Sequence, residues 1–91
     1  MTSKFNSKEI ALEEGLRYAG FGDAELRQEK LKRLTESKPE PTQIGWPHNK
    51  EVDLYKTKTP QGVEIGLGIG RFREGYDLWL IDIKSGAAQR A

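Results

Sequence analysis

The chain has 91 residues, of which 35% are hydrophobic and 32% are charged, so it is long enough for one domain and too short for two. Fifteen lysine and arginine residues against fourteen aspartate and glutamate residues give a net charge of +1, which excludes a protein that coats a polyanion or mimics one. The chain contains no cysteine, and His48 is its one histidine. We therefore expect no disulfide framework, no metal site and no cofactor.

The composition also argues against a membrane protein. The longest unbroken apolar run, Leu78 to Ile81, has four residues, whereas a membrane-spanning helix needs about 20. Residues 1–6 have no apolar stretch of the kind that secretory signals carry. We expect a soluble, cytoplasmic protein with no membrane partner.

The first predicted element is a helix that begins at Ser7. Asn6 and Glu9 have the spacing of a capping box around this helix start. The apolar positions with helical spacing are Ile10, Leu12, Leu16 and Ala19. Gly20 is placed to end the helix, and Gly15 inside it costs about 1 kcal/mol relative to alanine. A glycine there is tolerable if another element must come close.

A second helix is predicted from Asp23, a favourable N-cap residue, to about Glu36, so that the helical part covers 7–36. Its apolar arc consists of Leu26, Leu31 and Leu34. Its cations are Arg27, Lys30, Lys32 and Arg33. Glutamates lie between these cations, which is typical of a solvated face. Two short helices joined by a glycine-containing turn also have the form of a helix-turn-helix motif, and the four cations are then candidate nucleic-acid contacts.

The second half of the chain is predicted as a linker followed by a β-meander. Three of the four prolines lie in 37–51, which predicts an extended linker, pinned to the fold by Ile44 and Trp46. The β-meander covers 52–84, and the tail 85–91 is expected to fray. The expected strands are Val52 to Lys58, Val63 to Arg73 and Tyr76 to Ile83. Thr59-Pro60-Gln61-Gly62 and Glu74-Gly75 provide the turns.

Two-residue loops would pair Lys58 with Val63 and Arg73 with Tyr76, and this register assigns the faces of the sheet. The core face then holds Val52, Leu54, Val63, Ile65, Leu67, Ile69, Leu78 and Leu80. The second face holds Tyr55, Gly66, Gly68, Gly70, Phe72, Trp79, Ile81 and Ile83. In this register Trp79 lies opposite Gly70, and large side chains over cross-strand glycines need no ligand to explain them.

The predicted fold class is α+β, with an N-terminal helical hairpin packed on one face of a three-stranded antiparallel β-meander in a single domain, 1–91. The second face of this sheet is also apolar, which is unusual for an antiparallel sheet in contact with water. The sequence leaves three alternatives for what covers this second face: the linker through Ile44, Trp46 and Pro47, a second copy of the chain in a homodimer, or a foreign partner.

The motifs give no support to catalysis. Gly66 to Gly70 has alternating glycines but lacks the third glycine and the following helix of a dinucleotide-binding turn. Asp53, Asp77 and Asp82 lie in the predicted strands, with Asp82 on the face opposite the other two. General acid and base groups must converge, and these carboxylates do not, so we expect no enzyme.

We expect a non-enzymatic interaction module, an adaptor or inhibitor that docks a protein partner through the aromatic sheet face. The candidate contacts are Tyr55, Phe72, Trp79, Ile81, Arg71 and Arg73. The alternative is a nucleic-acid-binding regulator that uses the second helix or Arg71 and Arg73. Sheets that bind single-stranded nucleic acid also combine cationic side chains with aromatic rings. A salt titration separates the two, because binding to phosphates weakens steeply with salt.

Overall fold

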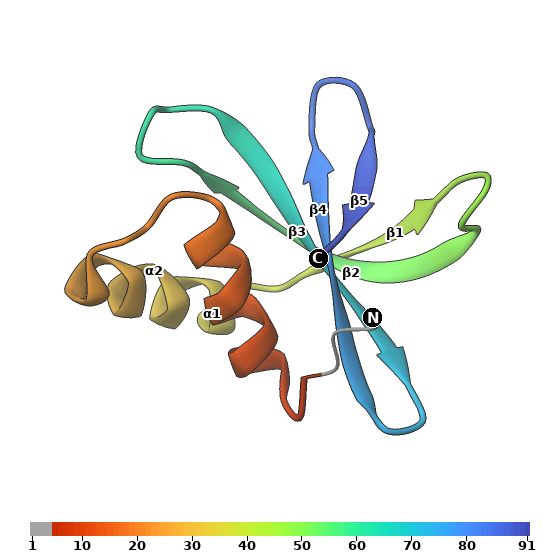
Figure 1. Ribbon diagram of the computed structural model, residues 1–91, viewed down its shortest axis with the longest axis horizontal. Coiled ribbons are helices and arrows are strands. Elements are labelled where there is room, and N and C mark those ends of the chain that lie inside the picture. The colour runs from red at the N-terminus through yellow and green to blue at the C-terminus, as the bar shows by residue number, and fades with distance from the viewer. Residues whose placement is uncertain (1–4) are drawn as a thin grey trace.

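The computed structural model describes residues 5–91, without the side chain of Phe72, as two helices followed by a five-stranded antiparallel sheet. The elements are α1 (Lys8–Tyr18), α2 (Ala24–Glu36), β1 (Glu40–Ile44), β2 (Lys50–Lys58), β3 (Glu64–Phe72), β4 (Gly75–Asp82) and β5 (Ala88–Arg90). Each strand pairs with the next along the chain (Figure 1). The α+β class with the helices first is confirmed, but the sheet has five strands instead of three.

Helix α1 begins one residue later than predicted, because Ser7 is its N-cap. Ser7 Oγ accepts a hydrogen bond from the Ile10 backbone N–H at 3.1 Å. At the other end Gly20 has a φ of +106°, and the N–H groups of Gly20 and Phe21 each donate to a carbonyl near the helix end at 3.0 Å. This is the Schellman arrangement, and it confirms that Gly20 ends the helix.

Helix α1 packs directly on β3 and β4. Its buried residues are Ala11, Leu12, Gly15 and Leu16, whereas Ile10 is 50% exposed and does not belong to the buried stripe. A Cβ added to Gly15 would lie 2.9 Å from Leu67 Cδ2 and 3.2 Å from Leu78 Cδ1. Glycine at this position therefore lets the helix approach the sheet closely, which explains a residue that weakens the isolated helix.

Helix α2 has the predicted bounds, with Asp23 as its N-cap. Asp23 Oδ1 accepts a hydrogen bond from the Glu25 N–H at 2.9 Å. The helix packs chiefly against α1. Leu34 is buried in the core, but Leu26 is 39% exposed. In the described part of the chain, neither helix is long and apolar enough to span a membrane.

The loop between β2 and β3 differs from the predicted one. The Thr59 N–H donates to the Val63 carbonyl at 2.8 Å, and Gly62 has a φ of +87°. These features define a three-residue loop that ends in a left-handed glycine, and this loop pairs Lys58 with Glu64 instead of with Val63. The register of β2 is thus shifted by one residue from the prediction.

A shift of one residue moves every side chain of β2 to the other face. Tyr55 pairs with Leu67 on the face that the helices cover, and Leu54 pairs with Gly68 on the second face. The predicted faces of Tyr55, Leu54 and Val52 are therefore wrong.

The turn between β3 and β4 lies one residue earlier than predicted, since Phe72 pairs with Gly75. The resulting shift of two residues keeps every side chain on its predicted face. Trp79 now lies opposite Gly68, and Ile81 lies opposite Gly66. The pairing of large side chains with cross-strand glycines is confirmed, although the partners differ.

Strands β1 and β5 lie in segments that were predicted to be irregular. In the segment 37–51, Ile44 of β1 pairs with Lys50. In the segment 85–91, Gln89 of β5 pairs with Leu80. Both strands are at an edge of the sheet, where one side of the backbone needs no partner, and for this reason β1 can contain Pro41.

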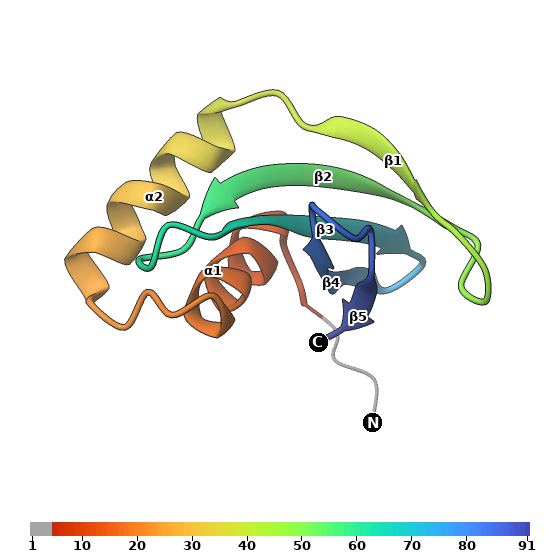
Figure 2. The same cartoon turned by 90° about the horizontal axis from the view of Figure 1, so that it is seen from above.

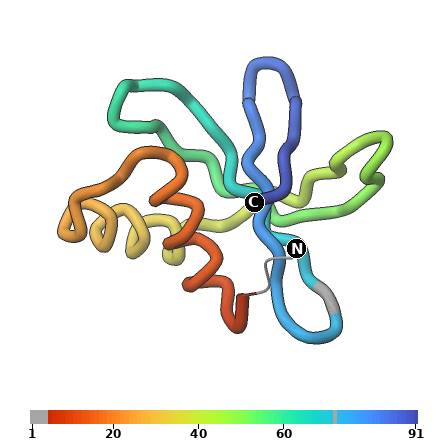
Figure 3. Tube along the Cα trace, viewed as in Figure 1, coloured from red at the N-terminus to blue at the C-terminus, as the bar shows by residue number. Residues whose placement is uncertain are grey.

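The sheet carries a hydrophobic cluster on each face. The cluster on the helix side consists of Ala11, Leu12, Leu16, Phe21, Leu34, Tyr55, Leu67, Ile69 and Leu78. The second cluster consists of Ile44, Val52, Leu54, Trp79 and Ile81. Strands β1 and β2 arch along their length (Figure 2), and the hairpin loops project in different directions in the trace of Figure 3. This strong twist lets the second face bury much of its own apolar surface.

The β1–β2 hairpin supplies part of the cover over Trp79. The ring of His48 lies 4.6 Å from the Trp79 ring in an edge-on arrangement, and Ile44 belongs to the same cluster. Trp46, by contrast, is 87% exposed. The chain therefore does cover this face, but through Ile44 and His48 and without Trp46.

These exposures predict opposite environments for the two tryptophans. Replacing Trp46 by alanine should change the free energy of unfolding by less than about 0.5 kcal/mol, because the indole makes little contact with the fold. The fluorescence maximum should move to the blue, because the remaining Trp79 is only 4% exposed. Trp79→Phe is the matched variant and should leave the red-shifted emission. A red shift in Trp46→Ala would contradict the burial of Trp79.

Candidate functional site

The structure divides the predicted docking residues among three places. Tyr55 is 6% exposed in the helix-side cluster, and Trp79 and Ile81 are 4% and 7% exposed in the second cluster. Arg71 and Arg73 are exposed at the end of β3 and in the following turn, and Arg71 lies 6.0 Å from the Tyr76 ring. The side chain of Phe72 lies outside the described part of the structure. These residues do not form one open aromatic face.

The cations of α2 are also divided. Arg27 is only 8% exposed, and its Nη1 donates to the Phe21 carbonyl at 2.9 Å and to the Gly22 carbonyl at 3.4 Å. Its Nε lies 3.5 Å from Glu13 Oε2, an ion pair without a hydrogen bond. Arg27 thus stabilises the connection between α1 and α2. Lys30, Lys32 and Arg33 remain at the surface or partly exposed.

The three aspartates of the sheet each have a structural partner. Lys8 Nζ lies 3.4 Å from Asp53 Oδ2 on the helix side, and Lys50 Nζ lies 2.8 Å from Asp77 Oδ2 on the second face. Asp82 Oδ1 accepts hydrogen bonds from two N–H groups of the β4–β5 turn. Within the described residues, no group of three or more acidic or histidine side chains is placed to hold a metal ion.

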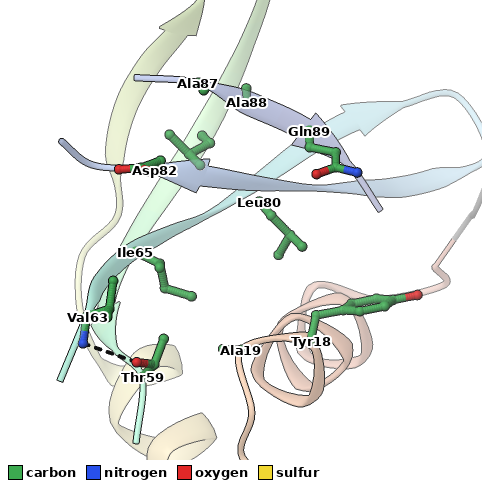
Figure 4. A pocket seen from close by; sticks show the side chains of 11 residues that line it. Tyr18, Ala19, Thr59, Val63, Ile65, Leu80, Asp82, Ala87, Ala88 and Gln89 are labelled. Carbon is green, nitrogen blue, oxygen red and sulfur yellow. Dashed lines mark hydrogen bonds between the residues drawn. The ribbon is translucent and has the colours of Figure 1, made fainter. Parts of the chain in front are cut away.

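A groove of about 500 Å³ lies between the C-terminal end of α1 and the strands β3, β4 and β5 (Figure 4). We call it the β5 groove. It arises because α1 ends at Tyr18, so that the helix covers Leu67 and Leu78 but not the continuation of the same strands. Ile65 and Leu80, which lie on the same face farther along, remain only half-buried.

Apolar side chains form most of the β5 groove. Figure 4 shows Ile65 and Leu80 directed from the sheet towards α1, with Tyr18 and Ala19 on the helix side. Tyr18 is 59% exposed, and Val63 in the β2–β3 loop is 58% exposed. Large apolar side chains at the rim of an apolar groove are typical of a protein-binding site.

The polar side chains of the β5 groove are mostly engaged in turns. Thr59 Oγ1 accepts a hydrogen bond from the Val63 N–H at 3.1 Å, and Asp82 Oδ1 accepts from Lys84 N at 2.9 Å. The side chain of Gln89 is exposed and provides an amide at the groove. The lining therefore offers apolar surface, the amide of Gln89 and the hydroxyl group of Tyr18.

Strand β5 gives this groove a backbone edge. Asp82 N donates to the Ala87 carbonyl and Ala91 N donates to the Leu78 carbonyl, both at 2.9 Å. In an antiparallel ladder, these bonds place the N–H and C=O groups of Ala88 and Arg90 on the side away from β4. Because β5 is the last strand of the sheet, no other strand in the described residues pairs with that edge.

Sequence reasoning did not identify Tyr18 and Val63 as surface residues of a site. Tyr18 lies outside the buried stripe of Leu12 and Leu16. An aromatic residue off this stripe, two positions before the helix-ending Gly20, was the one feature of the sequence that could have indicated an exposed aromatic side chain. Val63 was assigned to the core because it alternates with Ile65 and Leu67, but it lies in the loop before β3 and is exposed. Comparison of the chain with protein-family models, with curated proteins and with solved structures finds no match.

Proposed function

We propose that this protein is a non-enzymatic interaction module, an adaptor or inhibitor, that binds a protein partner through the β5 groove and the free edge of β5. The observation that supports it best is an apolar groove of about 500 Å³ directly beside an edge of β5 that no strand of the described residues pairs with. In this mode an extended segment of the partner pairs with Ala88 and Arg90 and places alternate apolar side chains over the groove. Tyr18 is the aromatic anchor.

Capture of partners from the cells that make the protein tests this proposal. Tyr18→Ala should weaken partner binding by about 30-fold or more, as expected when a hot-spot aromatic side chain is removed. Ile10→Ala is the matched control, because Ile10 is a 50% exposed apolar residue of the same helix that does not line the groove. This control should bind as the parent does.

A backbone variant tests the strand edge separately. Ala88→Pro removes an N–H group that points away from β4, so the pairing of β5 with β4 should survive while pairing with a partner strand is lost. Thermal unfolding of the variant checks that the fold is kept. Partner binding that survives both Tyr18→Ala and Ala88→Pro would contradict the proposed surface. Light scattering shows whether the occupant is a second copy, in which case Ala88→Pro should turn a dimer into a monomer.

The alternative function is nucleic-acid binding through α2 or through Arg71 and Arg73. Arg27 is 8% exposed and donates hydrogen bonds to carbonyl groups of the α1–α2 connection, which argues against its use as a nucleic-acid contact. Salt separates the two functions: docking of apolar surface should change little between 50 and 200 mM salt, whereas binding to several phosphates falls by orders of magnitude over that range.

A further inference from the structure

We propose that the segment bound at the free edge of β5 is an extended peptide that is apolar at three or more successive positions and carries a lysine or arginine at one end. The inference rests on the function proposed above and adds to it the chemistry of the partner. It follows from a further groove, on the opposite face of the sheet, that meets the β5 groove at the β4–β5 hairpin.

This further groove lies on the second face, between the β1–β2 and β4–β5 hairpins, which project next to each other in Figure 1. We call it the β1–β5 groove. It has a volume of about 310 Å³. The β5 side contributes only the small residues Gly86 and Ala88, so little side-chain volume fills the space. The apolar residues of the lining are Ile44, Leu54, Ile81, Ile83 and Ala88.

The two grooves meet at Ala88. The β5 groove is on the helix side, with Leu80 and Gln89, and the β1–β5 groove is on the side of the second cluster, yet Ala88 lines both. Ala88 is also a residue whose N–H and C=O groups point away from β4. A strand that pairs with Ala88 therefore has the β5 groove at one of its faces and the β1–β5 groove at the other.

The alternation of side chains along a strand sets the pattern of the partner. Successive side chains point to opposite faces, so one set lies over the β5 groove and the other over the β1–β5 groove. An amphipathic strand would place polar side chains against one apolar groove, where they lose contact with water. The outward backbone groups of Ala88 and Arg90 span three residues, which gives the minimum apolar length. A helix does not fit, because its own backbone bonds leave no groups for the edge of β5.

The charges of the two grooves favour a cation at one end of the segment. Asp82 lines both grooves, and its Oδ1 accepts hydrogen bonds from the N–H groups of Lys84 and Ser85. Among the described residues, no lysine or arginine lies within ion-pair distance of Asp82. Glu40 in the β1–β5 groove lies 3.8 Å from Lys56, and both side chains are more than half exposed, so this pair neutralises little. A lysine or arginine of the partner complements Asp82.

Selection of random peptides of about ten residues, displayed on phage, against the purified protein tests the inference. The enriched peptides should have three or more successive apolar residues next to a lysine or arginine. A synthetic copy of the most enriched peptide should bind about 5-fold or more weakly to Ile83→Ala, which removes apolar surface from the β1–β5 groove alone. Thermal unfolding checks the fold of this variant. Thr42→Arg crowds the same groove from β1 without changing the second cluster, and it should have the same effect.

Asp82→Asn tests the charge, because asparagine keeps the oxygen that accepts the turn hydrogen bonds and removes the negative charge. It should weaken binding of the same peptide by about 5-fold or more. Glu36→Gln is the matched control, since Glu36 is an exposed carboxylate that lines neither groove, and it should change binding by less than about 2-fold. Equal effects of the two variants would overturn the assignment of the cation to Asp82.

The outcomes separate this inference from the proposed function. Peptides that are apolar only at alternate positions, and that lose binding with Tyr18→Ala and Ala88→Pro but not with Ile83→Ala or Thr42→Arg, would overturn the inference and leave the proposed function in place. If no peptide is enriched, or if the enriched peptides bind Ala88→Pro as well as the parent, both are overturned.

Discussion

Replacing Leu67 by alanine should lower the free energy of unfolding by about 2 to 5 kcal/mol, the range for a fully buried leucine in a core that relaxes only partly. Leu67 is 0% exposed at the centre of β3. Its methyl groups pack against Gly15 of α1, so the substitution leaves a cavity between the helix and the sheet. Urea unfolding followed by circular dichroism measures the loss, which would be a large share of the stability of so small a protein.

Leu80→Ala is the matched control for this prediction. Sequence analysis placed Leu80 on the core face with Leu67, but in the structure it is only half-buried and lines the β5 groove. We therefore expect a smaller loss of about 1 to 2 kcal/mol, because part of the side chain already contacts water. Equal losses for the two variants would mean that a partner, or a second copy of the chain, covers the β5 groove under the conditions of the measurement.

The helices are the part of the fold that the sequence predicted best. Capping residues and helix-ending glycines act over a few neighbouring residues, so Asp23 and Gly20 can be identified without knowledge of the tertiary structure. The role of Gly15 could be anticipated only in part. The sequence indicates that some element comes close to this glycine, but not that Leu67 is the residue that does so.

The errors in the sheet come from loop lengths that differ by a single residue. A two-residue and a three-residue loop both accommodate Thr59-Pro60-Gln61-Gly62, and only the backbone shows that Gly62 takes the left-handed conformation. Because side chains alternate along a strand, this one residue decides whether Tyr55 or Leu54 shares a face with Trp79. Edge strands such as β5 are equally hard to predict, since three residues carry no periodic pattern.

The candidate sites depend on tertiary structure to a greater degree. The β5 groove exists because α1 ends at Tyr18, before the strands beneath it end. The sequence predicted where α1 ends but not which strand residues the helix leaves uncovered, because that depends on how the helix packs on the sheet. Tyr18 and Leu80 line the groove together, and nothing in a linear pattern relates them.

Gly68→Val should destabilise the protein by about 1 to 3 kcal/mol, even though valine favours a strand far more than glycine does. A Cβ added to Gly68 would lie 3.0 Å from Ile81 Cδ1 and 3.0 Å from Val52 Cγ2. Both neighbours belong to the second cluster and are at most 7% exposed, so neither can move away without displacing other core side chains. The cost of overpacking should therefore exceed the gain in strand propensity.

Gly22→Val provides the control, because no atom lies within 4 Å of the position that its Cβ would occupy. This variant should stay within about 1 kcal/mol of the parent, since it changes the conformational freedom of the chain without a steric clash. Thermal and urea unfolding of the two variants, measured side by side, separate overpacking from the general effect of replacing glycine. A Gly68→Val protein more stable than the parent would show that the alternating glycines of β3, Gly66, Gly68 and Gly70, face solvent. The second cluster would then be open, and Trp79, which lies opposite Gly68, would return as the candidate anchor for a partner.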